Sequence, residues 1–439
     1  MEDSQNKSRE GLVRTIGPRA LGINVFNMVV GGGIFVLPGV IASYLGPSAV
    51  LAFIICAFIV GLIFLCYAEV GSRVKRSGGS YAYIEEAFGP FAGSIASILF
   101  WFGWAGLADA AILVAMVETI VLIVPELANP ILKTLFMFGL LAFLVFINIR
   151  GVKSGVRLYI VNTIGKFIPL ALLIIVGVFY IDIDNLKITE LPTMEQIGGS
   201  ALILFFVFSG AECALNASGE IKNPEKTVPR GIFLGLGSIL LLYIGLQTVA
   251  QGVLGAELAN NTEAPLAATA EVVLGSWGGK LLLAGAVISI FATLSGEILA
   301  TPRIIFATAK DGNLPSFMAK IHPKYNTPYV AIIFYAFAIL FIALSGSFEK
   351  LAVLASGSIL LIYAGVSMAT LKIRLRDGPP SEDQFKMPGK AIIPVLSCSL
   401  IAWMLWQLTF DEAMGIAALI GVAIAIYLIQ KVMKKQNAD

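Results

Sequence analysis

The sequence has little charge and almost no histidine. Only 13% of its 439 residues are charged and 58% are hydrophobic, whereas a soluble globular protein carries roughly 25% charged residues. The single histidine, His322, cannot form a metal site or a serine-type triad, and its polar neighbours indicate a surface loop. The chain also has no GxxxxGK[ST] loop for nucleotide phosphates. We therefore expect no enzyme, no P-loop ATP-driven pump, no catalytic residues, no metal and no cofactor.

The cysteines and basic residues are too dispersed for two further kinds of function. The four cysteines lie in apolar runs without metal-ligand spacing, so neither a disulfide framework nor a cysteine metal site is expected. The 30 lysines and arginines nearly balance 28 acidic residues and are scattered among loops, which argues against a nucleic-acid partner. This composition places the chain in the membrane class, with the lipid bilayer as its surroundings.

Long apolar runs predict how the chain crosses the bilayer. A spanning helix needs about 20 mostly apolar residues. Such runs predict an all-α integral membrane protein with twelve transmembrane helices and no soluble domain. The predicted helices cover residues 20–44, 48–69, 92–123, 130–149, 155–181, 196–218, 229–253, 280–308, 328–345, 350–372, 391–409 and 412–433.

The basic residues predict the orientation in the membrane. Most of them fall in loops on one side if the N-terminal tail, 1–19, is cytoplasmic. The four lysines that then face outward are Lys133, Lys187, Lys280 and Lys350. Cytoplasmic loops are enriched in Lys and Arg. We therefore expect a multi-pass protein of the cytoplasmic membrane with both tails, 1–19 and 434–439, inside the cell.

Glycines interrupt the first predicted helix, in the stretch VVGGGIFVLPG. Gly31, Gly32 and Gly33 follow one another inside it, and glycine is among the poorest helix formers. Non-helical backbone persists at membrane depth only where it lines a cavity or is buried in protein. The alternative is a packing seam, because small residues let helices approach closely.

A second interruption is predicted in the sixth helix, where Ser209 and Gly210 break the aromatic run FFVFSGAE. Breaks at corresponding positions of two halves point to a transporter site built from inverted repeats. The halves would be 20–181 and 196–372, with 391–433 appended. Half-helix starts offer N–H groups to a carboxylate, and half-helix ends offer carbonyls to an ammonium. An α-amino acid carries both charges.

Four of the ionisable residues within predicted spans are candidates for a function, because such residues are costly in a membrane and usually functional. Lys166 either reaches the inner membrane surface or bonds to carbonyls freed by the first break, and burial would make it a candidate proton site. Glu212, just after the second break, is either a proton site or a structural acceptor. Asp109 and Glu297 either face the same cavity or pair with Arg303 or another helix.

These features together resemble the amino acid permeases of the amino acid–polyamine–organocation superfamily. The resemblance covers nearly the whole chain and rests on GGGIF, on FVFSGAECALNASGEIKNPEKTVPRGI, on AKDGNLP and on Lys166. It implies a five-plus-five inverted repeat of the leucine-transporter class with broken helices 1 and 6. It implies secondary active transport of an amino acid by alternating access, coupled to protons or to a counter-substrate.

The resemblance also implies roles for individual residues. Backbone at Gly31–Gly33, next to Ile34, would take the substrate carboxylate, and backbone around Phe206, Val207, Phe208, Ser209 and Gly210 would take the amino group. Phe206 would gate the site from outside, and Lys166 would contact backbone near Asn27. Asp109 and Glu297 depart from the family pattern and leave room for a cationic amino acid or an amine. A channel or a substrate sensor of the same fold is the other alternative.

Overall fold

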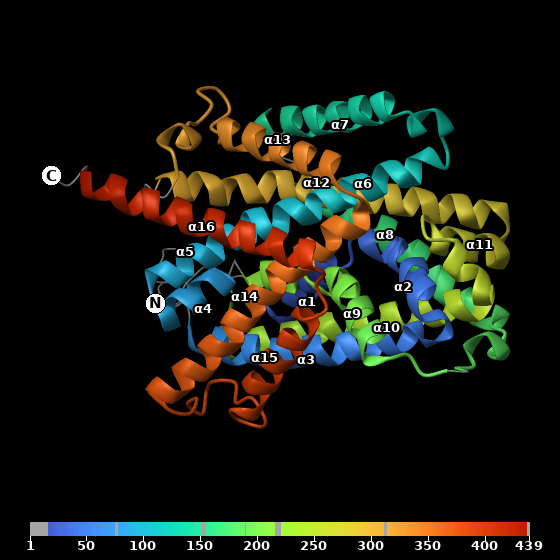
Figure 1. Cartoon of the computed structure of the whole chain (residues 1–439), viewed down its shortest axis with the longest axis horizontal. Helices are drawn as coiled ribbons and strands as arrows, with labels where there is room; N and C mark the ends of the chain where they lie inside the picture. Colours follow the sequence, from blue (N-terminus) through green and yellow to red (C-terminus); the bar gives the residue numbers. More distant parts are fainter. Residues whose placement is uncertain are drawn as a thin grey trace, which may run out of the picture.

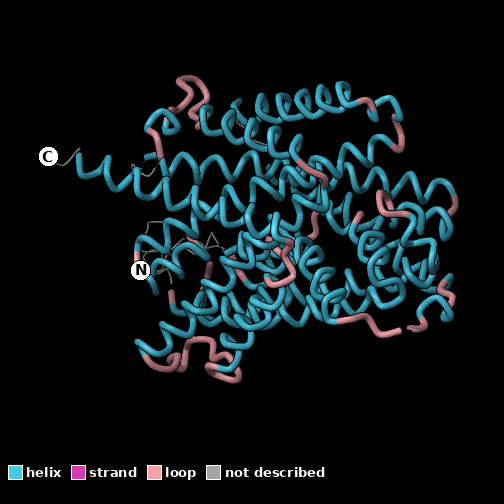
Figure 2. Tube along the Cα trace, in the orientation of Figure 1, coloured by secondary structure: helices cyan, strands magenta, loops and turns pink. Residues whose placement is uncertain are grey.

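Helices make up nearly all of the regular structure. The computed structural model describes residues 16–74, 78–150, 155–188, 190–215, 221–310 and 314–436. These residues contain no β-strand, only an isolated bridge between Ile16 and Ile221. The all-helical prediction is therefore confirmed for this part of the chain (Figure 2). The ends of the predicted tails, 1–15 and 437–439, lie outside the described residues, as do Lys75, Arg76, Lys153 and part of the predicted motifs after the sixth and eighth helices.

The helices follow the apolar runs of the sequence. The first half of the chain contains α1 Pro18–Val29, α2 Leu37–Leu45, α3 Ala49–Arg73, α4 Gly79–Phe88, α5 Pro90–Ile98, α6 Leu107–Val121, α7 Pro130–Arg150 and α8 Gly155–Gly177. The second half contains α9 Met194–Phe208, α10 Pro224–Leu254, α11 Pro265–Leu274, α12 Ser276–Lys310, α13 Tyr329–Ser345, α14 Phe348–Asp377, α15 Ile392–Leu405 and α16 Phe410–Gln436. Three short segments matter for the site: the 3-10 turns η1 Gly32–Phe35 and η7 Ala211–Leu215, and the π-helical stretch η3 Leu99–Gly106.

Within the described residues, eight helical stretches are long and apolar enough to cross a membrane. They are Leu37–Arg73, Pro90–Val121, Pro130–Arg150, Met194–Leu215, Pro224–Asn260, Ser276–Lys310, Phe348–Asp377 and Phe410–Ile429. Shorter apolar helices lie at Gly165–Tyr180, Pro265–Leu274, Tyr329–Ser345 and Ile392–Leu405. The chain is thus a multi-pass membrane protein, while the number of twelve crossings stays a prediction.

Most long helices run roughly along the longest axis of the molecule (Figure 1). The short helices α4 and α5 and the C-terminal end of α16 lie at one end, and α2 and α11 lie at the other. In this view the interrupted helices α1 and α9 lie near the middle of the molecule, whereas α7 runs along one edge. This arrangement encloses the two breaks between longer helices.

Glycines bring α1 against α10. A Cβ built on Gly231 would lie 2.6 Å from Leu21 Cδ2, and one on Gly235 would lie 2.5 Å from Val25 Cγ1. Leu21 and Val25 are fully buried in these glycine notches. Small residues allow this close approach between membrane helices. The seam fixes α1 beside α10 just before its break.

Candidate functional site

The first predicted helix is two helices in the structure. The helix α1 ends at Val29, Gly31 is extended, and the chain resumes through η1 into α2. Gly32 and Gly33 start η1, and the first N–H groups of a helical segment have no acceptor within it. Neither N–H has a backbone acceptor elsewhere among the described residues. This segment can therefore offer donors to an anionic group.

The sixth predicted helix is also interrupted. The helix α9 ends at Phe208, Ser209 is extended, and Gly210 has φ +113° before η7 begins. The two interruptions touch each other, because a Cβ on Gly210 would lie 2.9 Å from the carbonyl oxygen of Met28. Only glycine adopts such a positive φ without strain, and only glycine leaves room for the Met28 carbonyl here.

The three consecutive glycines have different surroundings. A Cβ on Gly32 would lie 2.2 Å from Ile290 Cγ1 of α12, and one on Gly33 would lie 2.6 Å from Val207 Cγ1 of α9. A Cβ on Gly31 would meet nothing closer than 3.9 Å. Gly32 and Gly33 are thus required for close packing, which was the alternative reading of the motif, and Gly31 alone has open space beside it.

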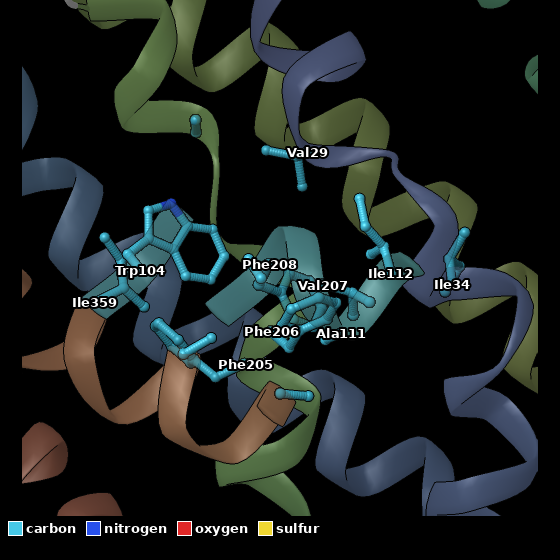
Figure 3. Packing of buried hydrophobic residues seen from close by; sticks show 14 of the residues in the cluster. Val29, Ile34, Trp104, Ala111, Ile112, Phe205, Phe206, Val207, Phe208 and Ile359 are labelled. Carbon is cyan, nitrogen blue, oxygen red and sulfur yellow. The ribbon is translucent and has the colours of Figure 1, made fainter. Parts of the chain in front are cut away.

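A cavity of about 70 Å³ lies where the two interruptions meet. Its lining includes these predicted site residues: Gly31, Gly32, Gly33, Phe206, Val207, Ser209, Gly210, Asp109 and Glu297. The sequence did not point to other lining residues, among them Trp104, Cys213 and Thr293. Figure 3 shows the hydrophobic side chains around this region, with Trp104, Phe206 and Ile112 among them.

Two of the residues predicted to bind the substrate do not line the cavity. Ile34 and Phe208 are fully buried in the hydrophobic core. The ring of Phe208 packs edge-on against Tyr243 and Phe53 instead, at centroid distances of 5.3 and 6.3 Å. Both side chains thus belong to the core and not to the cavity wall.

Lys166 lies behind the first break, outside the cavity lining. Its side chain is fully buried, so it does not reach the membrane surface. Nζ donates to the carbonyl oxygen of Asn27 at 2.8 Å and to that of Val30 at 2.6 Å. These are among the last carbonyls of α1, which have no partner within the helix. An ammonium on α8 therefore caps the broken end of α1.

Tyr243 is a residue that the sequence reasoning missed. Its hydroxyl, on α10, lies 3.1 Å from the Val29 carbonyl oxygen and 3.0 Å from that of Val207. One side chain thus contacts the broken ends of both interrupted helices. The signal was a tyrosine in an apolar run, followed at four-residue spacing by Gln247 and Gln251, which together form a buried polar stripe on one helix face.

Glu212 and Ser209 form hydrogen bonds with backbone groups of the second break, in the same segment of the chain. Both carboxylate oxygens of Glu212 accept from the Gly210 N–H, at 3.2 and 3.0 Å, and one also accepts from the Tyr363 hydroxyl. Ser209 Oγ donates to the Phe206 carbonyl at 2.8 Å. Glu212 is fully buried and does not line the cavity. In this structure it acts as an acceptor for the turn that follows α9.

Two acidic side chains reach the cavity from different helices. Asp109 of α6 accepts from the Tyr335 hydroxyl at 2.8 Å, and Glu297 of α12 accepts from the Thr301 hydroxyl at 2.8 Å. Arg303, considered above as their counter-charge, is exposed and donates to the Leu299 carbonyl. It forms no ion pair in the described part of the chain, so the sequence-based alternative of pairing with Arg303 is wrong.

Phe206 lies between two other aromatic side chains. Its ring is 6.0 Å from that of Trp104 and 5.7 Å from that of Phe348, both edge-on. Phe348 begins α14, next to Glu349, whose carboxylate accepts from Tyr44 at the end of α2. Phe206 thus connects the cavity lining to the start of α14, which the Tyr44–Glu349 hydrogen bond joins to α2.

Comparison with known proteins shows which family the chain belongs to. The family model for amino acid permeases matches residues 18–429. A serine/threonine exchanger, SteT of Bacillus subtilis (strain 168), is 29% identical over 98% of this chain and 99% of its own length. A methylthioribose transporter and a branched-chain amino acid permease, BcaP, of the same organism are 28% and 25% identical, over 97% and 96% of this chain and 95% and 93% of their own lengths. The chain, with its two interrupted helices around one cavity, belongs to the amino acid permease family.

Proposed function

We propose that this protein is a secondary active transporter that moves an amino acid across the cytoplasmic membrane by alternating access. The observation that carries the proposal is the cavity at the junction of two interrupted helices, with unpartnered N–H groups at Gly32 and Gly33 on its wall. Such groups suit a carboxylate. The family and the serine/threonine and branched-chain relatives support an amino acid as the substrate.

The substrate amino group would be held by backbone carbonyls near the end of α9. The carbonyls of Phe206 and Val207 already accept from Ser209 and Tyr243, but each carbonyl oxygen has two lone pairs. In this proposal Phe206 is the gate, and the chain forms twelve spans with a five-plus-five inverted repeat and both termini in the cytoplasm. Lys166 and Glu212 are the candidates for coupling to a proton or to exchange, because each fixes a break without lining the cavity.

Uptake into proteoliposomes tests the proposal. Purified full-length protein should take up labelled L-serine, L-leucine or L-lysine above protein-free liposomes. Uptake that requires internal amino acid identifies an exchanger, and uptake driven by an inward proton gradient identifies a symporter. A sensor of the same fold would bind without flux, and a channel would show no trans-stimulation. Absence of flux for all amino acids and common amines would contradict the proposed function.

A further inference from the structure

The described lining of the cavity contains two acidic side chains and no basic one. Asp109 is 2% exposed and lies on α6, and Glu297 lies on α12, yet both line the same cavity. Across the described residues, neither carboxylate forms an ion pair with a lysine or arginine. Acidic groups inside a membrane protein normally pair or mark a substrate or ion pathway.

Lys166 and Arg303, the two basic residues considered above within predicted spans, are engaged elsewhere. The ammonium of Lys166 is bound by the carbonyl oxygens of Asn27 and Val30, outside the cavity lining. The guanidinium of Arg303 donates to the Leu299 carbonyl on the exposed side of α12. The protein itself therefore provides no counter-charge for the two acids among the described side chains.

Each acid is held at one oxygen and left free at the other. Tyr335 occupies Oδ2 of Asp109, and Thr301 occupies Oε2 of Glu297. The remaining oxygens, Oδ1 and Oε1, accept no hydrogen bond from the residues that the structure describes. A hydroxyl donor of this kind fixes the orientation of a carboxylate and leaves an acceptor for a ligand.

The aromatic lining gives a second and independent indication of a ligand. Trp104 is 8% exposed and lines the cavity. Phe206 lies edge-on to it at 6.0 Å, and Phe100 also lines the cavity. Aromatic faces attract cations, tryptophan most strongly. Carboxylates together with aromatic faces are the surroundings that an organic ammonium or guanidinium requires.

We propose that Asp109 and Glu297, beside Trp104, form a subsite for a second positive charge, so that the preferred substrate is a cationic amino acid or a small diamine. This inference rests on the proposed function and specifies its substrate class. The backbone of the breaks would then bind the part shared by all amino acids, and the two acids would select by side-chain charge.

Transport and binding by the full-length protein test this inference. The probes are L-lysine, L-ornithine and putrescine, against L-serine and L-leucine. We expect the cationic probes to raise the melting temperature and to compete at least about tenfold better than the neutral ones. Asp109→Asn and Glu297→Gln should each weaken the cationic probes by about 30-fold or more, the cost of truncating one partner of a buried charge pair, with little effect on the neutral ones.

Glu118→Gln is the matched control. Glu118 lies on the same helix as Asp109, but it pairs with Lys133 at 3.8 Å between Oε1 and Nζ and does not line the cavity. Its substitution should leave the probe ranking unchanged. Where a variant fails to fold, the ranking of probes by the wild-type protein decides.

Three results would overturn the inference. Neutral probes that are preferred by the wild-type protein would show that the subsite does not select charge. A second such result is transport of the neutral probes that depends on protons in the wild type and loses this dependence in Asp109→Asn or Glu297→Gln. That result would show that these acids carry protons instead. Neither result affects the proposed function, whereas no binding or flux of any probe would contradict that function and the subsite together.

Discussion

The two interruptions are stabilised in different ways. The break after α1 is held by side chains from other helices, Lys166 of α8 and Tyr243 of α10. The break after α9 is held largely by its own segment, through Ser209 and Glu212, with Tyr363 and Tyr243 adding contacts. The first break thus depends on how three helices sit relative to one another, while the second depends mainly on local backbone geometry.

In our proposal, the two breaks therefore respond differently when the helices move. A break whose partners lie on other helices changes when those helices move, so it can report or drive a conformational change. A break capped by adjacent residues keeps its shape while the surrounding helices move. We therefore expect substitutions at the first break to affect transport more than stability, and substitutions at the second to affect stability more than transport.

The largest effect is expected from Lys166→Met. The substitution removes a buried ammonium and leaves the Asn27 and Val30 carbonyls without their donor, so the first break loses the contacts that join it to α8. Uptake in proteoliposomes should fall by about 100-fold or more. Lys187→Met, on an exposed loop where Nζ pairs with Asp184, is the control and should keep its uptake. Normal uptake by folded Lys166→Met protein would contradict a role for this contact in transport.

The next largest effect is expected from Gly210→Ala, which should reduce the stability of the protein. A non-glycine residue at φ +113° is strained by about 1–3 kcal/mol, and the new methyl group would lie 2.9 Å from the Met28 oxygen. The melting temperature of the purified protein should drop. Gly237→Ala serves as the comparison, because α10 is helical there with nothing within 4 Å, and it should be neutral or slightly stabilising. Equal melting temperatures would show that the second break adapts easily.

Tyr243→Phe should have an intermediate effect and tests the link between the breaks. It removes the hydroxyl that lies within 3.1 Å of the Val29 and Val207 carbonyls and keeps the ring packing against Phe208. A lost hydrogen bond of about 1.4 kcal/mol corresponds to about tenfold in affinity. Substrate binding, measured by thermal stabilisation, should weaken by that factor. Tyr180→Phe, an exposed tyrosine, should behave as wild type; equal loss in both variants would argue against the link.

The smallest effect is expected from Ser209→Ala. It deletes one hydroxyl bond to the Phe206 carbonyl, worth about 1 kcal/mol, and leaves the Glu212 contacts with Gly210 in place. The melting temperature should shift slightly and uptake should persist. A loss of uptake as large as that of Lys166→Met would show that the second break is as sensitive as the first, and the comparison between them would fail.

The sequence was sufficient for features that depend on local chemistry. Apolar runs predict the helices, because burial of such segments in lipid needs about 20 apolar residues. Gly31 and Gly210 predict where helices stop, since a poor helix former at membrane depth requires a special environment. The resemblance to the permeases, which the family comparison confirms, also implied that Lys166 contacts backbone near Asn27.

Features that depend on contacts between distant segments could not be predicted. The sequence shows that Gly32 and Gly33 are flexible, but not that Ile290 and Val207 fill the space beside them. Tyr243 is far from Val29 in the chain, and only the packing of α10 against both breaks brings its hydroxyl to them. Trp104 likewise looks like one of many aromatic residues until η3 places it at the cavity.

The glycine notches on α10 have a consequence for how the protein changes state. Leu21 and Val25 each pack against one glycine of α10. A Cβ built on Gly22 of α1 would lie 3.1 Å from the Cβ of Leu234. A seated side chain cannot shift by a fraction of its width without colliding with the backbone beside it. Packed interfaces of this kind have discrete arrangements rather than a continuous range. We therefore expect α1 to be either docked or undocked on α10, and the transport cycle to switch in steps.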